Sequence, residues 1–152
     1  YTLFEKMKEA YPKLSKMLEV QYRMNKTIME FSSQMMYNGK LRAAKKVEHH
    51  LLKDNFPGSK ALKEFTQEER YFLEQSCYML DTGGIDYTEE TDEETMSKYN
   101  MHEAAIVVKV LSHLRALGLK SDQVGVITPY KVQINKVKDE MRNKGLWNNG
   151  SF

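Results

Sequence analysis

Apolar residues in the first forty positions follow helical spacing in two stretches. The first runs from residue 1 to about residue 10, and Pro12 interrupts it, since proline disrupts a helix interior. The second follows Asn25, a common N-cap residue, and ends at Asn38-Gly39, because both residue types tolerate a positive φ. The pattern therefore predicts two helices in this part of the chain.

The second half of the chain contains two further helical patterns. Asn100 and Glu103 have the spacing of a capping box, and Gly118 closes the apolar pattern that follows them. A second amphipathic pattern extends from Tyr130 to Met141. The apolar positions of the first pattern are Ala104, Val107, Val108, Leu111, Leu114 and Leu117.

Short apolar runs between these helices predict strands. Residues 18–22 indicate a short strand, and residues 77–80 and 124–127 indicate buried strands. Strands that alternate with helices form a parallel sheet with right-handed crossovers. The sequence therefore predicts an α/β fold with a mostly parallel sheet.

Polar or aromatic residues directly follow each of these predicted strands. In open parallel sheets, ligands bind beyond the carboxyl ends of the strands. The three candidate binding places are therefore Gln21-Tyr22-Arg23, Asp81-Thr82-Gly83 and Thr128-Pro129-Tyr130.

Charge is separated along the chain, although the net charge is only +2. Residues 40–75 are irregular in pattern and mostly basic, and Asn38 to Lys63 holds seven Lys or Arg against two acids. Residues 85–98 form an acidic loop. The basic segment could meet a phosphate backbone, although a solvated surface is the commoner reason for such a run.

The sequence does not indicate several classes of site. It contains no G-x-x-x-x-G-K-[ST] P-loop, no G-x-G-x-x-G fingerprint and no nucleophile elbow. The four histidines and the single Cys77 lack ligand-like spacing, so we expect no metal site. No apolar run approaches the roughly 20 residues of a membrane helix, and residues 1–10 do not resemble a signal peptide. With Cys77 unable to form an internal disulfide, we expect a reducing intracellular location, cytoplasmic and/or nuclear, and no membrane partner.

Tyr22 and Arg23 have side chains suited to a nucleotide. A guanidinium can bind phosphate through two hydrogen bonds and can stabilise a transferred phosphoryl group as an arginine finger. Tyr22 offers a flat face for a base, and Gln21 offers a donor and an acceptor. From spacing alone, the favoured reading is structural: Tyr22 packs into the core and Arg23 pairs with a surface carboxylate.

The Thr128-Pro129-Tyr130 segment also permits two readings. A threonine hydroxyl and the first amides of the next helix can bind a phosphate. An ordinary strand-to-helix turn with proline near the helix start explains the same residues. For Asn100 and Glu103, helix capping is the leading interpretation.

Five segments together carry a family resemblance: QYRMN, IMEFSSQMMYNGKL, LDTGG, SKYNMHEA and VGVITPYKVQ. Their order and spacing over residues 3–142 resemble the second RecA-like domain of superfamily 1 helicases of the 5′-to-3′ class. The branch is that of the nonsense-mediated-decay and immunoglobulin-mu-binding helicases. The resemblance implies one partial RecA-like domain over residues 1–152, a three-layer α/β fold truncated at its C-terminal end.

The resemblance also implies roles for the candidate residues. Tyr22 matches the tyrosine that lies against adenine, and Arg23 matches the arginine that reaches the γ-phosphate of ATP. Gln21 matches the glutamine of the same motif. Thr128 matches the threonine of the T-P-Y segment, which contacts the sugar-phosphate backbone; Pro129 and Tyr130 complete that segment.

In this family ATP and Mg2+ are held mainly by the first RecA-like domain, whose P-loop lysine and magnesium-binding acids have no counterpart here. We therefore expect part of an ATP-dependent RNA or DNA helicase, without ATPase activity of its own. Its partners would be single-stranded RNA or DNA and the first RecA-like domain of the same protein. The alternative is a stand-alone α/β module that holds nucleic acid or a partner protein through its basic segment.

Overall fold

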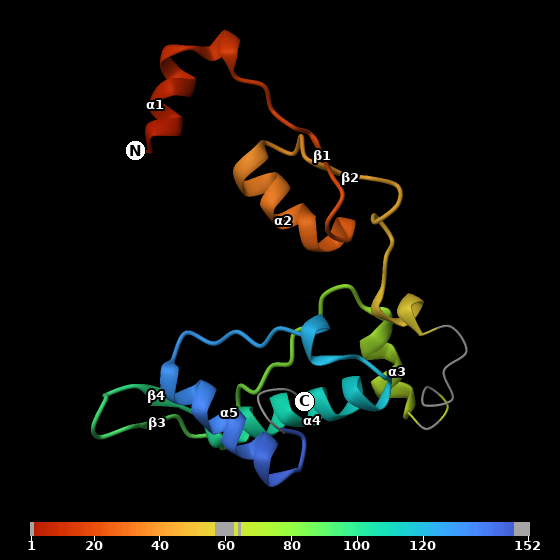
Figure 1. Ribbon diagram of the computed structural model, residues 1–152, viewed down its shortest axis with the longest axis vertical. Coiled ribbons are helices and arrows are strands. Elements are labelled where there is room, and N and C mark those ends of the chain that lie inside the picture. Colours follow the sequence, from red (N-terminus) through yellow and green to blue (C-terminus); the bar gives the residue numbers. More distant parts are fainter. Residues whose placement is uncertain (1, 57–62, 64, 148–152) are drawn as a thin grey trace. The chain divides into compact units, whose positions relative to one another are not determined.

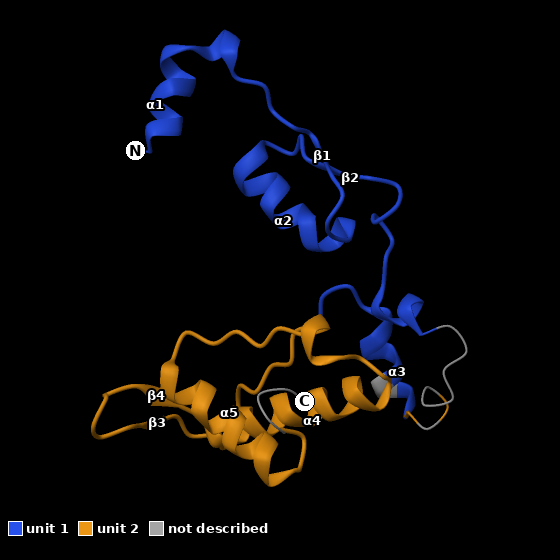
Figure 2. Cartoon of the chain, in the orientation of Figure 1, with its two compact units in different colours: residues 1–57, 66–78 blue, residues 58–65, 79–152 orange. Residues whose placement is uncertain are grey.

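The computed structural model describes residues 2–56, 63 and 65–147 (Figure 1). The chain divides into two compact units, and each is described by itself (Figure 2). Unit 1 comprises residues 1–57 and 66–78, and unit 2 comprises residues 58–65 and 79–152. None of the described helices combines the length and apolarity needed to cross a membrane.

Unit 1 contains both helices predicted in the first forty positions. Its elements are α1 (Leu3–Ala10), the 3-10 turn η1 (Pro12–Leu14), β1 (Val20–Gln21), α2 (Lys26–Tyr37), β2 (Arg42–Ala43), η2 (Leu52–Asn55) and α3 (Gln67–Glu74). The sequence did not predict α3, because the pattern of residues 40–75 appeared irregular. Part of that basic segment, residues 57–62 and 64, lies outside the described residues.

The first strand of unit 1 pairs with the second in parallel. Val20 lies opposite Arg42, and Gln21 lies opposite Ala43. The backbone N–H of Arg42 donates to the Glu19 carbonyl at 2.6 Å. Because α2 connects the two strands, β1, α2 and β2 form a small βαβ unit. The prediction of a strand within residues 18–22 is confirmed, and its pairing is parallel, although its partner β2 was not among the predicted strands.

The ends of α2 are fixed by the predicted capping residues. Asn25 Oδ1 accepts from the Thr27 N–H at 2.8 Å, and Asn25 Nδ2 donates to the His50 carbonyl at 3.0 Å. Asn38 has a left-handed backbone with φ 51° and ends the helix. The side chain of Asn25 thus both starts α2 and attaches it to the segment after β2.

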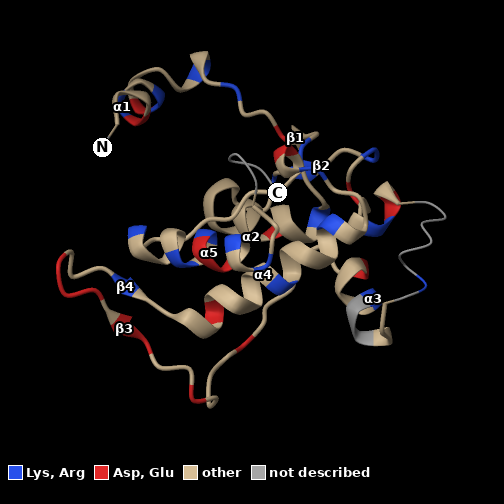
Figure 3. Cartoon of the chain, turned by 60° about the horizontal axis from the view of Figure 1, so that its bottom comes forward, with Lys and Arg blue, Asp and Glu red and all other residues tan. Residues whose placement is uncertain are grey.

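Unit 2 contains both helices predicted in the second half. Its elements are β3 (Glu90–Thr91), β4 (Lys98–Tyr99), α4 (Met101–Ala116), η4 (Ser121–Gln123) and α5 (Lys131–Asn143). The third and fourth strands pair antiparallel, so the predicted acidic loop contains a short hairpin. Acidic residues follow one another along this hairpin (Figure 3).

Two helices, α4 and α5, provide the core of unit 2. Apolar side chains of α4 at one-turn spacing pack against Val137 and Met141 of α5. The α4 members are Ala104, Val108 and Leu111, and Val108 is only 1% exposed. Gly118 follows α4 with φ 94°, a conformation that favours glycine, so the predicted helix end is confirmed.

Two predicted strands are wrong. Residues 77–80 and 124–127 form no strand, although Val124 has an extended backbone. Met79 is 84% exposed and Ile127 is 96% exposed. An extended segment becomes a strand only when a neighbour satisfies its N–H and C=O groups, and no described strand pairs with either segment. The described structure is a mixed helix and strand fold with a small parallel sheet.

Candidate functional site

Gln21 closes the turn between β1 and α2. Its Oε1 atom accepts from the backbone N–H groups of Arg23 and Met24, at 2.7 and 2.9 Å. Its Nε2 atom donates to the Met24 carbonyl at 2.7 Å. Both ends of this amide therefore bind backbone within the turn. Gln21 therefore positions its neighbours, because its hydrogen bonds fix the backbone of the turn that carries Tyr22 and Arg23.

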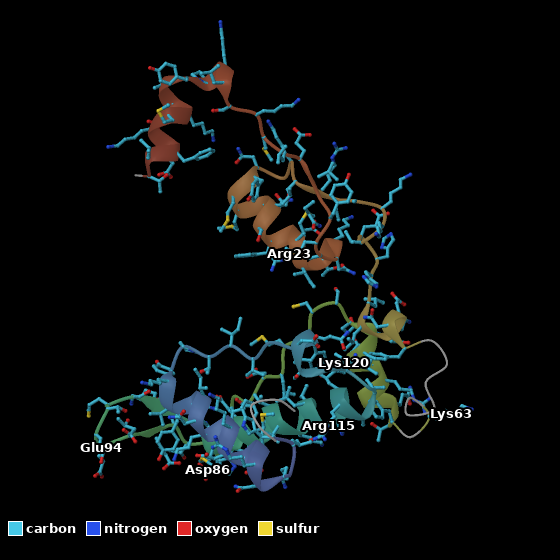
Figure 4. All side chains as sticks on the ribbon, viewed as in Figure 1. Arg23, Lys63, Asp86, Glu94, Arg115 and Lys120 are labelled. Carbon is cyan, nitrogen blue, oxygen red and sulfur yellow. The ribbon has the colours of Figure 1, made fainter. Side chains whose placement is uncertain are left out.

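Tyr22 and Arg23 project from this turn into solvent. Tyr22 is 72% exposed, and Arg23 is also exposed. Figure 4 shows Arg23 beside the start of α2. Among the residues that the structure describes, the Arg23 guanidinium has no hydrogen bond or ion pair. The structural reading of this pair, a core tyrosine and a surface ion pair, is therefore wrong for the described part of the chain.

Two carboxylates of unit 1 lie beside other basic side chains. Glu19 pairs with Arg42 at 3.5 Å, and Glu48 lies 3.6 Å from His49. Because β1 and β2 are parallel, their carboxyl ends meet at the same edge. The segment after β2 follows this edge, since the Glu48 carbonyl accepts from the Lys26 N–H at 3.1 Å. This edge therefore carries a cation without a partner among the described residues and an exposed aromatic ring, which together suit an anionic ligand with a base.

The Asp81-Thr82-Gly83 segment, in unit 2, is a local turn. The Asp81 carboxylate accepts from the Gly83 N–H at 2.8 Å. This bond is the usual Asx turn, in which the side chain serves the backbone. The observed hydrogen bond of Asp81 is thus explained by the turn itself and does not support the segment as a binding place.

Thr128, Pro129 and Tyr130 lead into α5 in unit 2. Thr128 is half-buried and lines a mostly apolar cavity of about 280 Å³, and its hydroxyl accepts from the Tyr130 N–H at 3.4 Å. Tyr130 is the N-cap residue of α5, but its side chain makes no capping bond. The positive end of the α5 dipole therefore lies beside the exposed residues Pro129 and Tyr130. A helix N-terminus in this position is suited to binding a phosphate.

Two buried amide side chains, those of Asn100 and Gln133, lie near this turn, and only Asn100 was identified from the sequence. Gln133 Oε1 accepts from the Asn100 N–H at 2.7 Å, and Gln133 Nε2 donates to the Asn100 carbonyl at 3.0 Å. Asn100 and Gln133 are each 8% exposed. Gln133 shares the buried stripe of α5 with Val137 and Met141 at four-residue spacing. A polar residue within that apolar stripe was the signal that could have identified it.

Asn100 is the N-cap of α4, as predicted, but the capping box is incomplete. Its Oδ1 atom accepts from the N–H groups of His102 and Glu103, at 3.0 and 3.1 Å. A capping box also needs the Glu103 side chain to accept from the Asn100 N–H. Gln133 takes that position instead, so the predicted role of Glu103 is wrong.

Within the described residues, no group of three or more His, Cys, Asp or Glu side chains could hold a metal ion. The structure therefore assigns no magnesium ligand to this chain's own described side chains.

Comparison with known proteins gives this geometry a context. Residues 1–149 match the family described as AAA domain. The chain is 39% identical, over 90% of its length, to DNA polymerase alpha-associated DNA helicase A of Saccharomyces cerevisiae. It is 31% identical over 94% of its length to DNA-binding protein SMUBP-2 of Rattus norvegicus, and 34% identical over 84% to Regulator of nonsense transcripts 1 homolog of Drosophila melanogaster.

The chain spans 20%, 14% and 10% of the lengths of these three relatives. The family match covers every candidate residue, from Gln21 to Tyr130. The family expected from the five sequence segments is therefore confirmed. The chain belongs to the AAA domain family, and its relatives are superfamily 1 helicases.

Proposed function

We propose that this chain is part of an ATP-dependent nucleic-acid helicase and forms much of its second RecA-like motor domain. The family match and the named helicases among the relatives support this assignment. The βαβ unit formed by β1, α2 and β2 is the expected local element of a RecA-like sheet. Because the chain spans a fifth or less of these three relatives, the first motor domain would belong to the same longer protein.

One observation carries the nucleotide assignment: the turn closed by Gln21 presents Tyr22 and Arg23 without partners among the described residues. Tyr22 would hold the adenine by stacking, and Arg23 would hold the γ-phosphate. ATP supplies the driving energy through hydrolysis of its γ-phosphate. The P-loop and the magnesium ligands would come from the first RecA-like domain.

The nucleic-acid assignment rests on the segment before α5. Thr128 would contact the sugar-phosphate backbone of a single strand, beside the start of α5, whose N-cap residue Tyr130 makes no side-chain capping bond. Exposed Pro129 and Tyr130 would border that contact. The first assignment uses the turn between β1 and α2 in unit 1, and the second uses the irregular segment before α5 in unit 2.

Arg23→Ala in the full-length protein tests the nucleotide assignment. We expect the rate of ATP hydrolysis at saturating ATP to fall by ~10³, since an arginine finger stabilises charge in the transition state. Arg142→Ala is the matched control, because Arg142 is exposed and, among the described residues, its side chain pairs with Asp139 within α5. Near-normal ATP turnover by the Arg23 variant would contradict the assignment of Arg23 to the nucleotide site.

The stand-alone module makes a different prediction for the 152-residue chain alone. Under that alternative, the isolated chain binds single strands with sub-micromolar affinity that falls steeply with salt. The helicase assignment predicts weak binding and no ATP hydrolysis, because half of each site is missing. Titration of labelled oligonucleotides at two salt concentrations separates the two, and reversal of charge at Lys45 and Lys46 identifies any binding by the basic segment.

A further inference from the structure

The buried amide pair of unit 2 connects three segments of the chain. Gln133 binds the backbone of Asn100 through two hydrogen bonds, as described above. The side chain of Asn100 donates from Nδ2 to the Tyr87 carbonyl at 3.0 Å and accepts from the start of α4. Every polar atom of the two side chains is therefore used. The pair holds together the start of α4, the start of α5 and the irregular segment that leads into the hairpin.

The hairpin makes further contacts with the first two turns of α5. The Ser97 hydroxyl accepts from the Val132 N–H at 3.4 Å. The ammonium of Lys136 lies 4.5 Å from the centre of the Tyr99 ring. Val132 and Lys136 are close to Gln133 in sequence. The beginning of α5 is therefore held by several contacts rather than by a single hydrogen bond.

The beginning of α5 directly follows the proposed nucleic-acid contact. Gln133 is three residues after Tyr130, and the Tyr130 carbonyl accepts from the Ile134 N–H at 3.3 Å. Pro129 has a restricted φ, which limits the freedom of the chain between Thr128 and the helix. Fixing the first turn of α5 therefore fixes the direction of the segment from Thr128 to Tyr130.

We infer that Gln133 is a positioning residue for single-strand binding. Through the Asn100 backbone it holds the start of α5, so that the segment from Thr128 to Tyr130 is ordered before the strand arrives. Less conformational freedom is then lost on binding. The inference rests on the proposed nucleic-acid role of Thr128.

The test measures single-strand binding by the full-length protein carrying Gln133→Ala or Gln133→Glu. The alanine leaves both Asn100 backbone groups unpaired. The glutamate keeps the acceptor for the Asn100 N–H but places an oxygen opposite the Asn100 carbonyl. We expect the Kd for a poly(U) or poly(dT) oligonucleotide to rise about tenfold in both variants, with the KM for ATP unchanged.

Val137→Ala is the matched control for a merely structural effect. Val137 follows Gln133 by one turn on the same buried stripe, and its truncation weakens the core but leaves the amide pair intact. At equal loss of Tm, this control should bind the oligonucleotide normally. Equal weakening by the control, or normal binding by Gln133→Glu, overturns the inference. Amide hydrogen exchange at residues 130–134 gives an independent readout, which should accelerate in the Gln133 variants only.

Thr128→Ala separates this inference from the proposed function. If Thr128→Ala weakens strand binding and the Gln133 variants do not, only the positioning role fails. If Thr128→Ala binds normally, the proposed nucleic-acid contact fails, and the positioning role fails with it.

Discussion

At the scale of single residues, Gln21 and Gln133 share one property: each uses its amide to bind backbone. Gln21 closes the turn that presents Arg23, and Gln133 binds both backbone groups of Asn100. A side-chain amide carries a donor and an acceptor at fixed separation, so it can satisfy an N–H and a C=O together. Each glutamine therefore supports a neighbouring candidate contact.

Tyr22 is expected to act through the face of its ring. We predict that Tyr22→Ala raises the KM for ATP of the full-length protein by ~10-fold, because stacking on a base contributes about 1–3 kcal/mol. Tyr22→Phe should keep a nearly normal KM, since the ring remains and the hydroxyl is not needed. Steady-state kinetics with ATP as the varied substrate measure both. A normal KM for the alanine variant would contradict the stacking role.

The candidate residues of the first turn could be predicted from sequence, whereas the bonds around them could not. Tyr22 and Arg23 follow a predicted strand and belong to one of the five segments that carry the family resemblance. Their positions in the chain therefore identified them as candidate ligand contacts. Their exposure was not indicated by spacing, because burial depends on which other segments of the chain pack against the turn. Gln133 was missed because its partner lies 33 residues away in sequence.

At the scale of elements, α1, α2, α4 and α5 were predicted because their signals are local, whereas α3 was missed. The predicted helix boundaries are observed: α2 begins after Asn25 and ends at Asn38, and α4 begins after Asn100 and ends before Gly118. The strands were predicted poorly, because a strand requires a partner from elsewhere in the chain. Residues 77–80 and 124–127 have the apolar composition of strands but no described partner.

The stability of the hairpin formed by β3 and β4 should depend on pH, because Asp92 titrates within it. Hydrogen bonds from the Thr95 hydroxyl and then the Thr95 N–H lower the pKa of the Asp92 carboxyl below its ordinary value. Because the folded pKa is the lower one, the stabilisation is complete above the ordinary pKa of an aspartate. It is lost as pH falls through the lowered folded pKa.

Nuclear magnetic resonance can follow this change through the Asp92 carboxyl carbon and the Thr95 amide. We predict that both signals titrate below the ordinary range of an aspartate. In Thr95→Val the hydroxyl donor is absent, so the Asp92 pKa should move back toward its ordinary value. Identical titration curves in the two proteins would show that the hydroxyl bond does not stabilise the turn.

At the scale of the whole molecule, the proposed activity requires more than the residues of this chain. Tyr22 and Arg23 suit the base and the terminal phosphate, but the sequence contains no P-loop and the described residues provide no metal cluster. Met79 and Ile127, which lie in the two segments wrongly predicted to be strands, are 84% and 96% exposed. Under the proposed function, the rest of a longer helicase would supply the P-loop and the magnesium ligands.

The most direct test of the nucleotide assignment is the distance between the Arg23 guanidinium and the γ-phosphate. It can be measured in a structure of the full-length protein with a non-hydrolysable ATP analogue and Mg2+. The assignment predicts a charge-assisted contact of about 2.7–2.9 Å, with the Tyr22 ring against the adenine. A bound analogue whose γ-phosphate is contacted by other residues, with Arg23 directed into solvent, would contradict it.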